Sequence, residues 1–222
     1  MNKLHKRPML GLLLLAFGAP VLALAGAATE QIKQTTEKIL AVVQDPALKG
    51  TDKDETRQTQ MKKVVDERFD WAAMARSAIG KNWRDLSEAQ RTEFTGLFSE
   101  LIEKNYMSKV ESYSGEKITY KGDKLDGVYG VVDVVISTLK GTDIPVSYRV
   151  QNKGTEWLVY DVSIEGVSLV NNYRSQLGSI LNSSSYAALI KKIKAKIAES
   201  APAESAENVI APTESKPAKA VL

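Results

Sequence analysis

The sequence contains no cysteine, and its only histidine is His5, close to the N-terminus. The chain therefore has no thiolate nucleophile, no thiolate metal ligand and no disulfide. After residue 5 it also lacks the imidazole that a Ser-His-Asp triad or a histidine metal site requires. These absences exclude the commonest nucleophilic and zinc-dependent enzymes. Without disulfides, a domain of this length depends on its hydrophobic core for stability.

Long apolar runs are absent apart from one near the N-terminus, over residues 9–19. Positive charges within residues 3–7 precede this run, and Ala23, Leu24 and Ala25 match the small-x-small cleavage rule. The run is shorter than the roughly 20 residues that a membrane span needs. We therefore expect a secretory signal peptide over 1–25, cleaved near Ala25 or Ala27, and an exported soluble product. No cysteine follows the run, which excludes a lipoprotein anchor.

An excess of positive charge is absent once the predicted signal peptide is removed. The full chain has 30 Lys and Arg residues against 27 Asp and Glu residues. Lys3, Lys6 and Arg7 lie within the signal peptide and all the acidic residues follow it, so the remaining charges balance. A domain without net positive charge gives no electrostatic case for nucleic-acid binding.

Apolar residues recur at helical spacing in several segments outside the signal peptide. Asp70 is placed to cap the N-terminus of one such segment and Gly80 to end it. Residues 87–90, Ser-Glu-Ala-Gln, form a capping box at the start of the longest segment. The sequence therefore predicts helices over 29–44, 55–68, 72–79, 87–112, 169–181 and 186–198.

Residues 117–164 show the two-residue alternation that is typical of strands. Turn sequences separate predicted strands over 117–121, 127–139, 144–151 and 158–164, and Gly130 is expected to mark an irregularity. The even positions are apolar and the odd positions largely polar, so we expect a four-stranded antiparallel meander with one buried face. The expected buried positions are Ile118, Tyr120, Val128, Val132, Val134, Ile136, Ile144, Val146, Tyr148, Val150, Leu158, Tyr160, Val162 and Ile164.

The chain is expected to turn a corner at Glu165 and Gly166, because glycine readily adopts a positive φ. Ser168 follows as the expected N-cap of a helix whose apolar face carries Leu169 and Tyr173. The sheet face and this helix face must close over either a packed core or a cavity. Both interpretations stay open, since a periodic pattern does not reveal a void.

Signals for catalysis are weak in this chain. Two Ser-x-x-Lys motifs, over 114–117 and 137–140, fall in predicted turns or strands, where hydroxyl and amine do not meet as they do in a helix. Asp133 and Asp161 share the polar face of the predicted sheet, and solvated carboxylates are the simpler interpretation than an acid–base pair. A small exported hydrolase that uses carboxylates alone and a periplasmic adaptor with a filled core remain as alternatives. No cofactor or metal is expected.

The C-terminal part of the chain offers no further motif. Lysines at 191, 192, 194 and 196 lie mostly on the polar side of the last predicted helix, where a solvated face is a simpler interpretation than a docking surface. Residues 199–222 are rich in Ala, Pro, Ser and Glu, a composition that predicts a disordered tail.

Two groups of residues, at defined order and spacing, carry a more specific signal. The first contains Phe69-Asp70, Met74-Ala75, Gly80, Trp83, residues 87–91 and Phe94; the second contains residues 157–162, 165–169 and Asn172-Tyr173-Arg174. Together they resemble the signatures of the MlaC, or toluene-tolerance, family. The order and spacing agree over roughly residues 30–198, whereas the Ala- and Pro-rich tail has no counterpart.

The resemblance implies a periplasmic lipid carrier that is an auxiliary component of an ABC transporter. Members of that family hold phospholipid acyl chains in an apolar pocket and leave the head group at its mouth. They shuttle lipid between an outer-membrane lipoprotein complex and an inner-membrane ABC transporter with an MCE-domain subunit, in support of outer-membrane lipid asymmetry. Related members are associated with hopanoids, so the implied ligand is a phospholipid or a hopanoid. The carrier is expected to be a monomer without enzymatic activity.

For this chain the resemblance implies an α+β fold, in which a four-stranded antiparallel twisted sheet is covered on one face by about six helices around an apolar cavity. The lipid-binding domain is expected over 26–198, between the signal peptide and the tail. We expect the lipid-binding residues to be Phe94, Phe98, Leu101, Ile102, Val132, Val134, Ile136, Val146, Tyr148, Val150, Leu158, Tyr160, Val162, Leu169 and Tyr173. Arg149 and Arg174 are the candidates for the head-group mouth or a partner surface.

Overall fold

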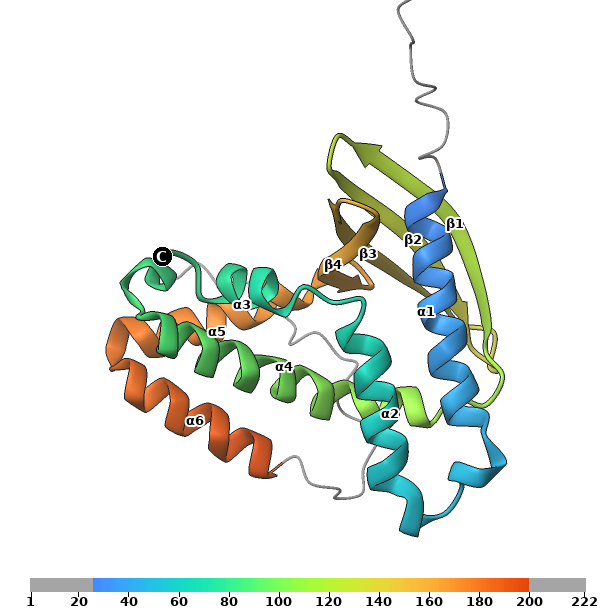
Figure 1. The fold of residues 1–222 in the computed structure, drawn as a ribbon, viewed down its shortest axis with the longest axis horizontal. Coiled ribbons are helices and arrows are strands. Elements are labelled where there is room, and N and C mark those ends of the chain that lie inside the picture. Colours follow the sequence, from blue (N-terminus) through green and yellow to red (C-terminus); the bar gives the residue numbers. More distant parts are fainter. Residues whose placement is uncertain (1–25, 200–222) are drawn as a thin grey trace, which may run out of the picture.

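A computed structural model describes residues 26–199 of the chain. The predicted signal peptide and the tail beyond Glu199 lie outside the described residues. In the described part, α-helices, 3₁₀ helices and an antiparallel sheet make up an α+β fold, as the sequence predicts (Figure 1). Within residues 26–199, no helix is both long enough and apolar enough to span a membrane.

The α-helices agree closely with the predicted segments. They are α1 (Ala27–Gln44), α2 (Asp54–Asp66), α3 (Trp71–Ile79), α4 (Glu88–Glu111), α5 (Leu169–Ser183) and α6 (Tyr186–Glu199), with 3₁₀ turns η2 (Pro46–Leu48), η3 (Thr51–Lys53) and η4 (Gly80–Asp85) between them. Helix α1 runs along the sheet, whereas α3 to α6 form a separate helical layer (Figure 1).

The predicted helix caps are confirmed by their hydrogen bonds. The side chain of Asp70 accepts from the Ala73 amide at 2.9 Å, and that of Ser168 accepts from the Asn171 amide at 3.1 Å. Ser87 and Gln90 form both bonds of the capping box. These bonds satisfy amide groups that the first helical turn leaves without a partner.

The sheet contains five strands rather than the predicted four, in the order β1-β2-β3-β4-β5. The strands are β1 (Lys117–Asp126), β2 (Tyr129–Ser137), β3 (Asp143–Lys153), β4 (Glu156–Ile164) and β5 (Val167–Ser168). The additional strand arises because Glu165 and Gly166 adopt φ angles of 51° and 81°, which make a tight hairpin turn instead of an open corner. The chain therefore pairs back onto β4 for two residues before α5 begins.

Strand β1 extends five residues beyond its predicted end at residue 121, and the irregularity in its pairing with β2 falls between Tyr120 and Gly122. Gly130, where an irregularity was expected, pairs regularly with Leu125. Instead, glycine at this position lets the Leu125 side chain pack directly on the backbone, because a Cβ atom at residue 130 would lie 2.5 Å from Leu125 Cδ2.

A second bulge, between Arg149 and Val150 in the pairing of β3 with β4, reverses the alternation of β4. Val150 stands opposite Val159, and Gln151 stands opposite Leu158. Trp157 and Val159 are therefore on the buried face, and the expectation that all even positions of β4 face the core is wrong for Leu158 and Tyr160. One unpaired residue is enough to exchange the two faces of a strand.

Residues 68–70, which link α2 to α3, pair with β4 in parallel. The Val159 amide donates to the Arg68 carbonyl and the Asp70 amide donates to the Val159 carbonyl, both at 2.8 Å. The Arg68 guanidinium donates to the side chains of Gln31 and Thr35 and to the Trp157 carbonyl, at 2.8 to 3.1 Å. This link ties α1 and the helical layer to β4.

Asp161 is buried rather than solvated, with 3% of its surface exposed. Its carboxylate accepts from Ser168 Oγ at 2.6 Å and from the Val170 amide at 3.1 Å. A carboxylate at the N-terminus of a helix is stabilised by the free amides and by the helix dipole. Asp161 thereby fixes the start of α5 against β4.

Replacing Asp161 by alanine is expected to lower the free energy of unfolding by about 2 to 3 kcal/mol, because two buried donors lose a charged acceptor. Chemical denaturation followed by circular dichroism measures this change. The control is Asp126→Ala at an exposed position of β1, where we expect a change within about 0.5 kcal/mol. Equal effects of the two substitutions would contradict the role given to Asp161.

Candidate functional site

Two hydrophobic cores hold the described residues together. The helical core contains the buried side chains of Met74, Ala75, Ala78, Ile79, Leu86, Phe94, Phe98, Leu101, Ile102, Val170, Leu177, Leu189, Ile190, Ile193 and Ile197. The sheet core contains those of Ala28, Ile32, Val132, Val134, Val146, Val150, Trp157, Val159, Val162 and Leu169. Phe69 and Tyr106 pack against both cores, so these two side chains mark the place where the cores meet.

The predicted site residues on α4 and α5 lie in or against the helical core. Phe94 and Phe98 stack at a centroid distance of 5.8 Å, and Phe98 meets the edge of Tyr173 at 5.5 Å. Leu101 and Ile102 are buried beside them. These five side chains are in contact with other helices and belong to the interior of the helical layer.

The predicted site residues on the sheet are in the other core. Val132, Val134, Val146, Val150, Val162 and Leu169 are buried there, and Ile136 and Tyr148 pack against it while half-buried. The residues expected to form the wall of one chamber are thus divided between two cores.

Leu158 and Tyr160 lie on the opposite, outer face of the sheet because of the bulge described above. Tyr160 meets Tyr129 edge to face at 6.0 Å, and the Arg149 guanidinium lies 5.8 Å from the Tyr160 ring centroid. Arg149 is therefore exposed on the outer face of the sheet, away from the buried face.

Arg174 is exposed on α5 and lies against the C-terminal end of α3. Its guanidinium nitrogens are 3.0 and 3.1 Å from the point where a Cβ atom of Gly80 would stand. Gly80, with φ of 61°, thus leaves room for the arginine at the negative end of the α3 dipole.

A set of half-buried apolar side chains packs against the sheet core, and two of them also pack against the helical core; we call this set the junction cluster. Its strand members are on the buried face of the sheet, and its two other members are the residues shared by both cores. The cluster consists of Phe69, Tyr106, Ile118, Tyr120, Ile136, Ile144 and Tyr148. Half-buried apolar side chains beside a packed core are candidates for contact with an apolar ligand.

The tyrosines of the junction cluster are in a poorly solvated environment although their side chains keep some exposure. Burial, with a smaller contribution from Tyr120, raises the pKa of Tyr148 to about 12. Burial also raises the pKa of Tyr106 and of Tyr120.

Sequence reasoning placed three of the seven junction residues on the apolar face of the sheet without assigning them to the site: Ile118, Tyr120 and Ile144. It used Phe69 only as part of a family signature. The available signal was the continuation of the α4 apolar stripe into Tyr106, beyond the residues that fill the helical core. The pairing of residues 68–70 with β4, which places Phe69 between the cores, has no local sequence signal.

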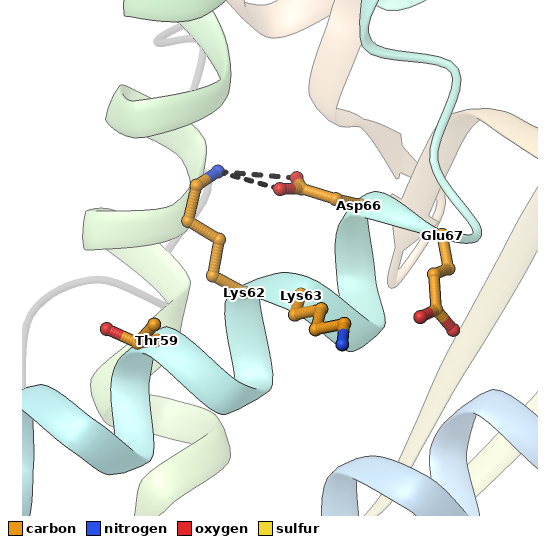
Figure 2. Close-up of a pocket in the computed structure, with 5 residues that line it drawn as sticks. All are labelled: Thr59, Lys62, Lys63, Asp66 and Glu67. Atoms are coloured by element: carbon orange, nitrogen blue, oxygen red, sulfur yellow. Dashed lines mark hydrogen bonds and ion pairs between the residues drawn. The ribbon is translucent and has the colours of Figure 1, made fainter.

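Two surface hollows lie elsewhere on the described residues, and most of the residues that line them are polar or charged. The first, of about 460 Å³, is bounded by Thr59, Lys62, Lys63, Asp66 and Glu67 at the end of α2 (Figure 2). Lys62 there is paired with Asp66 at 3.2 Å and with Glu103 at 2.6 Å. The second, of about 440 Å³, is closed by an ion-paired Arg57. In both hollows, charged side chains of the wall take part in ion pairs.

The groups weighed for catalysis are engaged in structural contacts. Ser114 donates to Glu116, and Ser137 donates to Asp143 at 2.6 Å, so neither hydroxyl meets the lysine of its motif. Asp133 accepts from Ser147 and is paired with Lys124, on a different strand from Asp161. Within residues 26–199, no group of three or more acidic or histidine side chains is arranged to hold a metal.

Comparison with known proteins identifies the family. The family model described as MlaC protein matches residues 33–195, which is most of the described part. This chain belongs to the MlaC family.

One curated relative is the intermembrane phospholipid transport system binding protein MlaC of Haemophilus influenzae, 29% identical over 121 residues. The aligned region is 52% of this chain and 56% of the relative, so the chain spans little more than half the length of that protein. A solved structure, a phospholipid-binding protein from Ralstonia solanacearum in complex with a phospholipid, matches with a TM-score of 0.72. At 22% identity, over 79% of this chain and 99% of the other, it shows that the MlaC-family fold is shared.

The environment of Tyr148 predicts a late phenol titration. Burial also raises the pKa of Tyr186 to about 12, so two tyrosines are expected to ionise late in absorbance measurements near 295 nm. Tyr148→Phe should remove one of these two late steps, and Tyr186→Phe the other. Because the unfolded chain ionises first, Tyr148 should make the folded state less stable as pH rises from about 10 towards 12. A Tyr148→Phe variant with an unchanged titration curve would contradict this assignment.

Proposed function

We propose that this protein is a soluble periplasmic carrier that holds the acyl chains of a phospholipid at the junction cluster. The observation that carries the proposal is the set of half-buried apolar side chains against the sheet core, two of which also pack against the helical core. Membership of the MlaC family supports it, as do the printed descriptions of the two relatives, both of which name phospholipid.

An acyl chain at this site would exchange one apolar environment for another. Moving a 16-carbon chain from water into an apolar site stabilises it by about 12 kcal/mol, at roughly 0.8 kcal/mol per CH₂. Leaving the bilayer costs a similar amount, so transfer between membrane and carrier is nearly balanced. Small differences in partner binding then decide the direction of transfer.

Such a carrier needs no catalytic group and no energy source of its own. We propose that it takes lipid from or delivers it to an outer-membrane lipoprotein complex and an inner-membrane ABC transporter with an MCE-domain subunit. In this role the chain works as an exported monomer that supports outer-membrane lipid asymmetry. The predicted signal peptide supports export to the periplasm.

The alternative of a carboxylate-only hydrolase is less well supported. Asp161 is committed to Ser168 and to the start of α5, and Asp133 to Ser147 and Lys124. A general acid or base needs a carboxyl group that is free to exchange a proton with a substrate. The other alternative is an adaptor with a filled core, which would contain no lipid. The lipid content of the purified protein therefore distinguishes an adaptor from a carrier.

Organic extraction of the purified protein followed by mass spectrometry is expected to release phospholipid, in a ratio near one lipid per protein. The apolar surface of the junction cluster should retain the lipid through purification because its release into water is strongly unfavourable. Fully folded protein that contains no lipid, and takes up none from phosphatidylglycerol vesicles, would overturn the proposal.

A bulky residue in the junction cluster should block the site. Ile136→Trp adds volume on the buried face of β2 at the half-exposed row that includes Ile118 and Ile144. We expect at least a fivefold loss of bound lipid in this variant. The matched control is Val135→Trp, one residue away on the outer face, which should retain normal lipid content.

Circular dichroism of both variants shows whether they fold. If Ile136 faced a filled core, its replacement by tryptophan would instead destabilise the protein by about 1 to 3 kcal/mol without a selective loss of lipid.

A further inference from the structure

Basic residues gather at the C-terminal end of α3 with little acidic charge beside them. Across α3, η4 and α5 the basic residues are Arg76, Lys81, Arg84 and Arg174, and Asp85 is the one acidic residue of these three elements. The full chain has 30 basic and 27 acidic residues, so this part of the helical layer is far more basic than the chain as a whole. All four basic side chains are exposed, and we call them the basic patch.

The fold brings the basic patch together around Gly80. Helices α3 and α5 pack against each other in the helical layer, and η4 continues directly from α3 (Figure 1). The Arg174 guanidinium lies 3.0 Å from the point where a Cβ atom of Gly80 would stand. Lys81 follows this glycine, and Arg76 precedes it by about one helical turn. Lys81 and Arg84 are three residues apart in a 3₁₀ helix, a spacing that places them on the same side of it.

The charges of the basic patch are not neutralised within the fold. No carboxylate of residues 26–199 forms an ion pair with any of its four side chains. Other lysines of the helices are paired, as Lys62 is with Glu103 and Lys194 with Glu93. Neighbouring positive charges repel one another, and an anionic partner relieves that repulsion. A patch of one sign of charge therefore favours association with a surface of the opposite sign.

We propose that the basic patch docks this protein on the anionic surface of a lipid bilayer. This inference goes beyond the proposed function, because it concerns where the protein meets a membrane and does not depend on the lipid-binding site. The charged groups are carried on long, exposed side chains of three elements, an arrangement that suits a surface of many mobile phosphates. Attraction of this kind acts without insertion of apolar residues, so the docking is reversible.

An acidic protein is the competing partner for a basic patch, and the distribution of apolar residues favours the bilayer. Among the described residues, the large apolar ones that are exposed lie in the strands of the sheet or the turns beside them, and none is in α3, η4 or α5: Val128, Tyr129, Leu139 and Val167. Protein–protein interfaces have a buried centre that is rich in aromatic and apolar side chains. Binding to a bilayer surface through charge needs no such centre.

The test is sedimentation of the purified protein with vesicles of phosphatidylcholine, or with mixed vesicles of phosphatidylcholine and phosphatidylglycerol. Wild-type protein should bind the mixed vesicles and not the neutral ones. Raising the NaCl concentration from about 0.1 M to about 1 M should abolish this binding, because the Debye length falls from about 10 Å to about 3 Å. Each basic residue near an anionic surface strengthens binding about fivefold, so Arg76→Gln/Lys81→Gln/Arg84→Gln should bind about a hundredfold more weakly.

The matched control is Lys117→Gln/Lys121→Gln/Lys140→Gln, which removes three exposed lysines from β1 and from the turn after β2. The control and the triple variant of the basic patch have the same net charge and the same termini, so the comparison isolates the position of the charges. The control should bind like wild type. Arg76→Lys/Arg84→Lys keeps the charges and should also keep the binding, whereas a structural role of the guanidinium groups would reduce it.

The outcomes separate this inference from the proposed function. The docking assignment is wrong if wild-type protein does not bind the mixed vesicles, which would leave an acidic protein as the partner, or if the control loses as much binding as the triple variant. Lipid recovered by extraction from the same preparations would leave the carrier function standing in either case. Lipid-free protein that binds the mixed vesicles through the basic patch would overturn the carrier function and keep the docking surface.

Circular dichroism shows whether the triple variant folds. If it does not, Lys81→Gln alone carries the test, with an expected loss of binding of about fivefold. Unchanged binding of a folded Lys81→Gln variant would contradict the assignment.

Discussion

The pairing of residues 68–70 with β4 is the contact on which the rest of the structure depends. Strand β4 is covered by β5 over only two residues, so the remaining backbone groups on that side need other partners. Val159 obtains them from Arg68 and Asp70, at 2.8 Å each. The Arg68 guanidinium adds bonds to α1 and to the Trp157 carbonyl. One short segment therefore joins the first helix, the sheet and the helical layer.

This joint explains why the molecule has two cores instead of one. Phe69 lies at its centre and packs against both, while α1 is packed on the sheet and α3 to α6 pack on one another. Phe69 and Tyr106, at the boundary between the cores, keep an exposure that a single filled core would remove.

The polar groups near the junction cluster follow the same logic. Tyrosine hydroxyls and the Lys109 ammonium sit in surroundings that disfavour charge, as the raised pKa of Tyr148 and the lowered pKa of Lys109 indicate.

The sequence by itself determined the α-helices, four of the five strands, the helix caps and the family, because helical spacing, strand alternation, the Asp70, Ser87 and Ser168 caps and the signature residues are all local patterns. It also assigned β2 and β3 to the correct faces, except at Val128, which was expected on the buried face but precedes β2 and is 51% exposed. Only the tertiary structure decided the faces of Leu158 and Tyr160, since a one-residue bulge against β3 leaves no mark in the local pattern of β4. The tertiary structure also placed Phe94 and Phe98 in one core and Val132 and Val146 in the other, a division that the apolar pattern of the sequence does not reveal. Periodicity predicts which side chains are buried. Only the packing of the layers decides which other side chains each of them contacts.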